Sequence, residues 1–293
     1  MTDTTSTRQR QGESSGLLAL LTLLHLFNGV SSGIGAMIGY LITVWHHQLV
    51  LDYAVLLAAG LATLLVSSGG FVINDILDIE IDRINRPDRP LAAGLVSMRV
   101  AWALCLGTTL AGVLLAFMIG TGPGIVAGLI ALALFAYSYD LKKRFLIGHL
   151  TIAVMGAALL PFGALAAGEL LPVLYSVVFV FPAFIAREVL KTVPDYAGDR
   201  AAGVDNIATR YGPQTALRVA QVALGIVALV LPLVPLVWPL NAGYFILVIG
   251  VIIPVTLYTL YRANLDNVKR ISSMSKMLFL LTTIALLVGS VPG

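Results

Sequence analysis

The sequence predicts an all-α integral membrane protein with nine transmembrane helices. Its 293 residues are 58% hydrophobic and only 11% charged, and the apolar residues form long runs. Soluble domains carry about 25% charged residues, and roughly 20 apolar residues are enough to cross the hydrocarbon core of a bilayer. Such runs lie at about 17–44, 50–73, 98–119, 123–140, 147–167, 170–190, 215–238, 242–261 and 273–291.

The first apolar run follows a polar tail, residues 1–15. This run has the full length of a span and no small-residue cleavage site stands out, so we expect a transmembrane helix rather than a cleaved signal. We expect the tail to be disordered. Residues 16–293 contain no linker, low-complexity block or shift in composition, which predicts one integral domain.

The distribution of cationic residues predicts the orientation. If the connections are assigned to alternate sides, all 18 Lys and Arg residues fall on one side, and the other side holds only Asp52 and Glu169. Lys and Arg are retained in the cytoplasm, so we expect a multi-pass protein of the cell membrane with its N-terminus in the cytoplasm. Topology and anionic membrane lipid explain the net charge of +3, and no nucleic-acid partner is required.

Cysteine and histidine give no sign of redox chemistry or of a metal cluster. The single Cys105 lies in an apolar run and has no partner for an intrachain disulfide. The four histidines are too scattered for a recognisable metal-binding spacing. The acidic and basic residues are therefore the candidates for the chemistry.

A weak internal repeat relates the two parts of the chain. The second and sixth runs each lead into an acidic and basic segment, and the fourth and eighth end in the similar stretches YSYDLKKR and YRANLDNVKR. Parallel repeats of this kind occur in membrane folds. We therefore expect two related four-helix halves and a ninth helix around a central cavity, with both acidic segments on the same face.

The first acidic segment, residues 74–94, follows the second run. If that helix continues, Asn74, Asp78 and Asp82 stack on one face at a spacing of four residues, with Asp75 beside them. Mg²⁺ takes hard oxygen ligands and is usually held by one or two carboxylates together with substrate phosphates. The sequence therefore favours a divalent cation site. The structural alternative is a solvated helix end neutralised by the arginines that follow.

Those arginines belong to the stretch NRPDRP, residues 85–90. Its two prolines end the helix and are expected to fold Arg86 and Arg89 back toward the acids.

The second acidic segment, residues 187–212, carries a longer register. Arg187, Lys191, Asp195 and Asp199 fall on one helical face, and Pro194 is expected to kink that helix. Alone, the strip is also consistent with a ladder of ion pairs. Opposite the first segment, the two carboxylate clusters ringed by cations fit a diphosphate bridged by Mg²⁺ better than a structural set of salt bridges.

A third piece, residues 135–149, ends the fourth run at the same surface. Lys142 is suited to bind phosphate as a point charge, and Tyr137 is placed to donate a hydrogen bond to a bridging oxygen. Taken alone, the piece is more typical of an aromatic and basic anchor at the membrane interface than of a phosphate site.

These three pieces, in this order, resemble the signatures of the UbiA-type intramembrane prenyltransferase superfamily. The first acidic segment is similar to its NDxxDxxxD signature with an NRPxRP extension, and the second to its DxxxD signature. Tyr137 and Lys142 match its tyrosine-to-lysine element. The resemblance runs from about residue 25 to about residue 290. It implies a Mg²⁺-dependent enzyme that binds a polyprenyl diphosphate and holds the isoprenoid tail in a tunnel within the membrane.

The resemblance also implies roles for individual residues. The implied catalytic residues are Asp78, Asp82, Asp195 and Asp199. The implied metal ligands are these four together with Asn74 and Asp75. The implied diphosphate-binding residues are Arg86, Arg89, Tyr137, Lys142, Arg187 and Lys191, and the implied acceptor region contains His25 and Asn28.

Within the superfamily, the segments EIDRINRPDRP and REVLK are most similar to the archaeal branch that forms digeranylgeranylglyceryl phosphate. This implies transfer of a geranylgeranyl group to geranylgeranylglyceryl phosphate, a lipophilic acceptor in ether-lipid synthesis. The alternative with the same mechanism is prenylation of an aromatic, chlorophyll or quinone precursor. Three residues depart from the family pattern: His25 replaces a common Arg, His149 a common Asn, and Pro194 a frequent acid. His25 bears on the acceptor rather than on the chemistry.

A transporter is the alternative from another class. Ionisable groups that carry ions through a transporter belong near the bilayer midplane. The acids of this chain lie at the cytoplasmic ends of the predicted spans, and the runs themselves hold almost no ionisable residue. This placement favours an enzyme at the membrane face.

Overall fold

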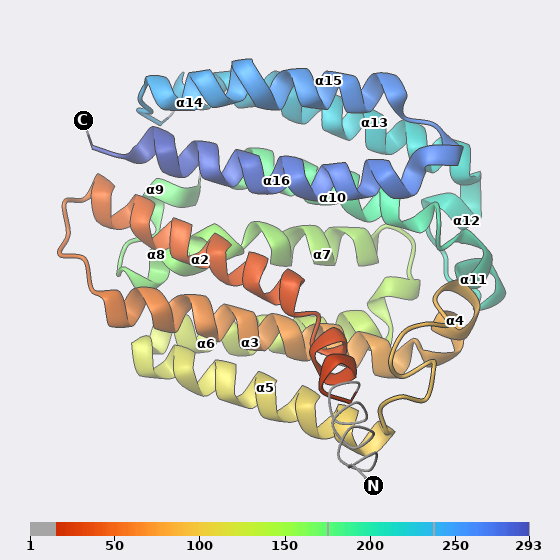
Figure 1. Cartoon of the computed structure of the whole chain (residues 1–293). Coiled ribbons are helices and arrows are strands. Elements are labelled where there is room, and N and C mark those ends of the chain that lie inside the picture. The colour runs from red at the N-terminus through yellow and green to blue at the C-terminus, as the bar shows by residue number, and fades with distance from the viewer. Residues whose placement is uncertain (1–15, 175, 237, 293) are drawn as a thin grey trace, which may run out of the picture.

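The computed structural model describes residues 16–174, 176–236 and 238–292, and every regular element within them is a helix. This confirms the predicted all-α class. The long helices lie side by side in one bundle with their axes close to parallel (Figure 1). The predicted disordered tail, residues 1–15, lies outside the described residues.

In the first part of the bundle successive membrane-spanning segments alternate in direction, and α7 and α8 together form one such segment. Within this part α3 packs against both α2 and α5, and α2 also packs against α8. The bounds are α2 (Leu26–His46), α3 (Tyr53–Leu77), α5 (Met98–Ile119), α6 (Thr121–Tyr139), α7 (Ile147–Ala157) and α8 (Leu159–Ala166).

The second part contains more interrupted helices. In it α10 packs against α7 and α13, and α16 packs against α2, α10 and α14. The bounds are α9 (Leu171–Leu174), α10 (Val177–Thr192), α13 (Pro213–Val230), η2 (Leu231–Leu236), α14 (Ala242–Leu247), the π-helical turn η3 (Val248–Ile252), α15 (Ile253–Arg262), η4 (Leu265–Asn267) and α16 (Val268–Ser290).

Eight helical segments in the described part of the chain are long and apolar enough to cross a membrane, so the chain is a multi-pass membrane protein. The sixth predicted run, 170–190, does not belong to this set. It holds only α9 and the 16-residue α10, whose last turns carry charged residues. A ninth span and the division into two four-helix halves therefore stay predictions.

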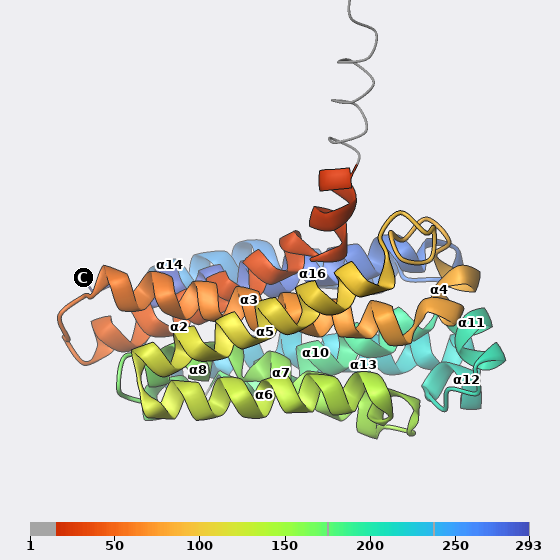
Figure 2. The same cartoon turned by 90° about the horizontal axis from the view of Figure 1, so that it is seen from below.

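The first predicted run, 17–44, is not one continuous helix. His25 has a left-handed backbone (φ 47°, ψ 44°), and the helical residues before it turn away from the bundle (Figure 2). A left-handed residue cannot continue a right-handed helix, so the chain changes direction immediately before α2. The side chain of His25 lies against the first acidic segment.

Short elements gather at one end of the bundle, where Figure 1 shows α4, α11 and α12 together. They are α4 (Ile79–Asn85), η1 (Leu141–Lys143), α11 (Tyr196–Ala201) and α12 (Ile207–Tyr211). Each of these elements either follows directly on a long helix that ends at this end of the bundle or lies in the connection to the next long helix. The acidic segments belong to this end, so the fold brings them together as the sequence predicts.

Glycines allow α2 and α8 to approach closely. A Cβ built on Gly163 would lie 1.8 Å from the carbonyl oxygen of Ala36, and one on Gly39 would lie 2.1 Å from that of Leu160. Small residues that let backbones meet are the usual means of helix association in membranes. The wall formed by α2 and α8 therefore depends on the absence of side chains at these positions.

We expect Gly163→Val to destabilise the bundle by about 3 kcal/mol or more, because backbone atoms of α2 cannot move aside as a side chain can. Gly107→Val is the matched control, since a Cβ at Gly107 meets no atom within 4 Å. The midpoint of thermal unfolding in detergent measures both. Equal midpoints for the two variants would contradict the proposed packing.

Candidate active site

The first link between the two acidic segments is the amide of Asn85 at the end of α4. Its Nδ2 donates to the backbone oxygen of Asp195 at 3.1 Å, and its Oδ1 accepts from the backbone N–H of Gly198 at 3.0 Å. A Cβ at Gly198 would lie 2.4 Å from Asn85 Nδ2. A side chain at position 198 would therefore displace the Asn85 amide that joins α4 to α11.

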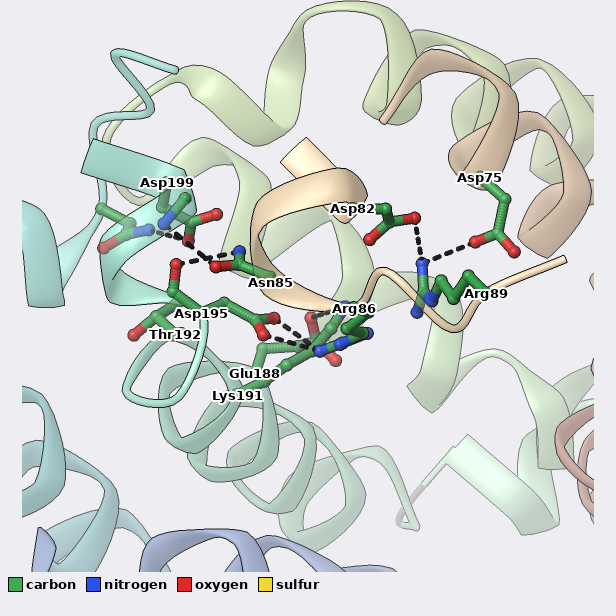
Figure 3. Close-up of polar contacts among 12 residues, drawn as sticks. Asp75, Asp82, Asn85, Arg86, Arg89, Glu188, Lys191, Thr192, Asp195 and Asp199 are labelled. Carbon is green, nitrogen blue, oxygen red and sulfur yellow. Dashed lines mark hydrogen bonds and ion pairs between the residues drawn. The ribbon is translucent and has the colours of Figure 1, made fainter. Parts of the chain in front are cut away.

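The second link is the guanidinium of Arg86, the residue after α4. Its Nη2 lies 2.7 Å from both carboxylate oxygens of Asp195 (Figure 3). Ion pairs that also form hydrogen bonds are stronger than neutral hydrogen bonds. An arginine of the first segment thus neutralises an acid of the second.

Within the first segment, Arg89 joins two acids. Its Nη1 donates to Asp75 Oδ1 and to Asp82 Oδ2, both at 2.7 Å (Figure 3). The other oxygen of Asp75 lies 2.9 Å from His25 Nε2. Asp75 is buried, so its two partners fix it in place. Arg89 therefore folds back toward the acids of its own segment, as expected from the prolines, whereas Arg86 reaches the second segment instead.

The third predicted piece meets the same cluster. Lys142, in η1, donates to Asp78 Oδ1 and to Asn74 Oδ1, the latter at 3.4 Å. On the opposite side, Asp199 accepts a hydrogen bond from Asn206 Nδ2 at 2.9 Å. Acids from both segments and cations from three parts of the chain therefore converge at one end of the bundle.

The four-residue helical register predicted for each acidic segment is kept in the first segment and interrupted in the second. In the first segment α3 ends at Leu77, but Asp78 N–H still donates to the oxygen of Asn74 and Asp82 N–H to that of Asp78. The four-residue spacing is kept. In the second segment α10 ends at Thr192 and α11 begins at Tyr196, because Pro194 interrupts the ladder of hydrogen bonds.

The pKa shifts of the charged groups differ between the Asp199 side of the cluster and the Asp82 and Lys142 side. Burial and the neighbouring Asp195 carboxylate raise the pKa of Asp199 to about 6, since its direct partner is a neutral amide. Burial also raises the pKa of Asp82, with Arg89 opposing the change. Burial lowers the pKa of Lys142, against the attraction of Asp78. The Asp199 side of the cluster is where additional positive charge is most needed.

The donor set fits a divalent cation that is also bound by a ligand. One oxygen each of Asp78, Asp82 and Asp199 accepts no hydrogen bond from the described residues. Carboxylate oxygens are hard ligands of the kind that Mg²⁺ takes. Within the described part of the chain, no three Asp, Glu, His or Cys side chains are close enough to hold a metal ion alone. Such a site would need ligand oxygens as well, and Mg²⁺ shared with phosphates meets this condition.

A polar pocket and a larger apolar cavity meet at this cluster. The pocket is lined by Asp78, Asp82, Asp195 and Asp199 with the cations around them. The cavity has a volume of about 580 Å³ and lies between α2, α3, α6, α7, α8, α10 and α16, lined mostly by apolar side chains. Four residues line both spaces: Asn74, Tyr137, Glu188 and Lys191. One ligand can therefore place a charged group in the pocket and an apolar tail in the cavity.

The other predicted site residues take distinct places. Arg187 lines the cavity but not the pocket, and Asn28 lines the cavity from α2. Asp75 lines neither space among the described residues and holds Arg89 and His25 instead.

Sequence reasoning missed Glu188 as a site residue. It is buried and lies between Arg187, whose Nη1 is 2.6 Å from Oε1, and Lys191, whose Nζ is 3.9 Å from Oε2. The four-residue spacing used to find the site includes Arg187 and Lys191, but Glu188 lies one position away from it and was not included. An acid next to Arg187 within an apolar run was the available signal.

Comparisons with known proteins bear on this arrangement. The model of the UbiA prenyltransferase family matches residues 32–283. The chain belongs to the UbiA prenyltransferase family. The resemblance inferred from the motifs is thereby confirmed, and the chain is a prenyltransferase. A digeranylgeranylglyceryl phosphate synthase of Metallosphaera sedula is 36% identical over 93% of this chain and 95% of its own, and that of Saccharolobus solfataricus is 30% identical over 94% and 98%.

Solved structures of UbiA homologues share the fold. A structure of a digeranylgeranylglyceryl phosphate synthase superposes with a TM-score of 0.71 at 28% identity and covers 94% of this chain and 99% of its own. A UbiA homologue from Aeropyrum pernix has a TM-score of 0.76 at 22% identity over 89% and 96%. One from Archaeoglobus fulgidus, bound to GPP and Mg²⁺, has 0.69 at 17% over 92% and 99%.

We expect Asn85→Ala to weaken the link between the two acidic segments, because it removes both hydrogen bonds of the Asn85 amide and leaves, among the described residues, only the Arg86–Asp195 ion pair. The loss of two partly buried hydrogen bonds should lower the free energy of unfolding by about 1–3 kcal/mol and reduce prenyl transfer. Asn264→Ala is the control, since Asn264 only caps η4 at the surface. Unfolding midpoints and turnover measure both effects, and wild-type turnover in Asn85→Ala would show that this link is dispensable.

Proposed function

We propose that the protein transfers a geranylgeranyl group from geranylgeranyl diphosphate to geranylgeranylglyceryl phosphate, with Mg²⁺, at the cytoplasmic end of the bundle. The proposal rests on one observation: the polar pocket, lined by acids and cations, opens into the apolar cavity. The names of the relatives from Metallosphaera and Saccharolobus support the choice of acceptor.

The polar pocket binds the diphosphate. Arg86 and Lys142 are paired with Asp195 and Asp78 in the structure, and they exchange these carboxylates for phosphate oxygens when Mg²⁺ occupies the acids. Asn74, Asp78, Asp82, Asp195 and Asp199 hold the metal, which neutralises the leaving group when bound. Asp75, proposed from the family pattern as a ligand, contributes by fixing Arg89 at the wall of the pocket. The homologue bound to GPP and Mg²⁺ supports the use of Mg²⁺ with a prenyl diphosphate.

The reaction needs charge stabilisation rather than a nucleophilic side chain. The allylic C–O bond breaks with its electron pair on the diphosphate, and Arg86, Arg89 and Lys142 donate hydrogen bonds to the departing oxygens. Tyr137, at the junction of the two spaces, orients the diphosphate. The hydroxyl oxygen of the acceptor bonds to the allylic carbon, and its proton passes to the diphosphate.

The apolar cavity serves the prenyl chains. Its side chains, which include Phe162, Phe184 and Phe279, keep water from the allylic cation. His25 and Asn28 lie at the start of α2, where His25 bonds to Asp75 and Asn28 lines the cavity. They form the acceptor region.

The orientation completes the proposal. The cation-rich connections of the sequence meet at the end of the bundle that carries α4, α11 and α12 (Figure 1). Retention of Lys and Arg in the cytoplasm puts this end, and the polar pocket, on the cytoplasmic side, where a charged diphosphate is supplied from water.

The test is a transfer assay with purified protein, Mg²⁺ and geranylgeranyl diphosphate against a panel of acceptors, read by mass spectrometry. Geranylgeranylglyceryl phosphate should be prenylated at least about tenfold faster than hydroxybenzoate or a quinone precursor. EDTA should abolish transfer, and excess Mg²⁺ should restore it. Preference for an aromatic acceptor would support the second candidate function, and no transfer to any acceptor would contradict both.

A further inference from the structure

Three cations line the apolar cavity, and two of them, Arg187 and Lys276, do not line the polar pocket among the described residues. Arg187 and Lys191 reach its wall from α10, and Lys276 reaches it from α16. Among the described residues that line the cavity, Glu188 is the acid that faces these three cations. Helices α10 and α16 pack against each other along the bundle (Figure 1).

The pairing of these charges leaves an excess of positive charge. Arg187 lies 2.6 Å and Lys191 3.9 Å from the carboxylate of Glu188, which uses both of its oxygens. Lys276 forms no ion pair with any described residue; Arg187, Lys191 and Arg86 repel it, and Glu188 attracts it less strongly. Like charges gathered at the edge of an apolar space are unfavourable without a counter-ion.

Neither the diphosphate nor a prenyl tail accounts for this excess. The diphosphate lies in the polar pocket among Arg86, Arg89 and Lys142, and neither Arg187 nor Lys276 lines that pocket among the described residues. A prenyl tail is neutral and gains nothing from cations. The excess therefore indicates a second anion, attached to a molecule whose remainder is apolar.

We propose that Lys276, together with Arg187, binds the phosphate of the acceptor and makes the enzyme selective for a phosphate-bearing prenyl glycerol lipid. This inference rests on the proposed function, because it assigns a subsite to its second substrate. Glu188 fixes the positions of Arg187 and Lys191. Lys191 lines both the polar pocket and the apolar cavity, whereas Arg187 lines only the cavity. The acceptor phosphate and the donor diphosphate are thus bound by different cations on either side of Glu188.

The decisive variant is Lys276→Gln, which removes the charge and keeps most of the side-chain length. We expect the KM for geranylgeranylglyceryl phosphate to rise at least about tenfold, as for loss of a charge-assisted hydrogen bond, and the KM for geranylgeranyl diphosphate to stay within about twofold. Lys269→Gln is the matched control, because Lys269 is exposed on the same helix and does not line the cavity. Lys276→Arg should restore the wild-type KM.

The uncharged acceptor geranylgeranylglycerol separates phosphate recognition from tail binding. Wild-type enzyme should prefer the phosphate-bearing acceptor, and Lys276→Gln should lose that preference while using the uncharged acceptor as wild type does. An unchanged acceptor KM in folded Lys276→Gln would overturn the proposal. An equal rise in both KM values would also overturn it, because the lysine would then serve the diphosphate.

A binding measurement keeps the inference testable without turnover. Geranylgeranylglyceryl phosphate, added without donor or Mg²⁺, should raise the unfolding temperature of wild type and not that of Lys276→Gln. Phosphatidic acid and inorganic phosphate are the comparison ligands. If either raises the unfolding temperature of wild type as much, the cations bind a bilayer headgroup or free phosphate and the proposal fails. If wild type transfers nothing to this acceptor but is still protected by it, the proposed function fails and the subsite stands.

Discussion

The contact of Asn85 and Arg86 with α11 is the interaction on which the candidate site depends. Two acidic segments repel each other unless something holds them together, and here the amide of Asn85 bonds to two backbone groups of the α11 segment. Arg86 adds its charge to Asp195. The absence of a side chain at Gly198 permits the approach. Without these contacts each acidic segment would be a separate charged end of a helix.

The main features of the site could be predicted from the sequence because they depend on local spacing. Asn74, Asp78 and Asp82 share a face since hydrogen bonds cross the break after α3, and the prolines turn Arg89 back onto Asp75 and Asp82. Long apolar runs predicted the all-α membrane fold for the same reason. These are properties of single segments, which a linear pattern contains.

Other features depend on contacts between segments and were not predictable in this way. The left-handed backbone at His25 breaks an apolar run that reads as one helix. Glu188 gains its place only because Arg187 and Lys191 both turn to it. The 16-residue α10 is shorter than the run suggested, because it begins only at Val177, after the separate α9. Which cation pairs with which acid is determined by tertiary packing.

In this account the two acidic segments act as one Mg²⁺-diphosphate site. The most direct test is calorimetric binding of an unreactive thio-analogue of geranylgeranyl diphosphate, with Mg²⁺, to Asp78→Asn, Asp195→Asn and the double variant. Glu80→Gln is the control, because Glu80 is exposed on α4 and pairs with Arg83. We predict that each single variant weakens binding about 100-fold and that the double variant is little worse, as for groups that act as a unit. Losses that add, or wild-type binding by Asp195→Asn, would contradict a shared site.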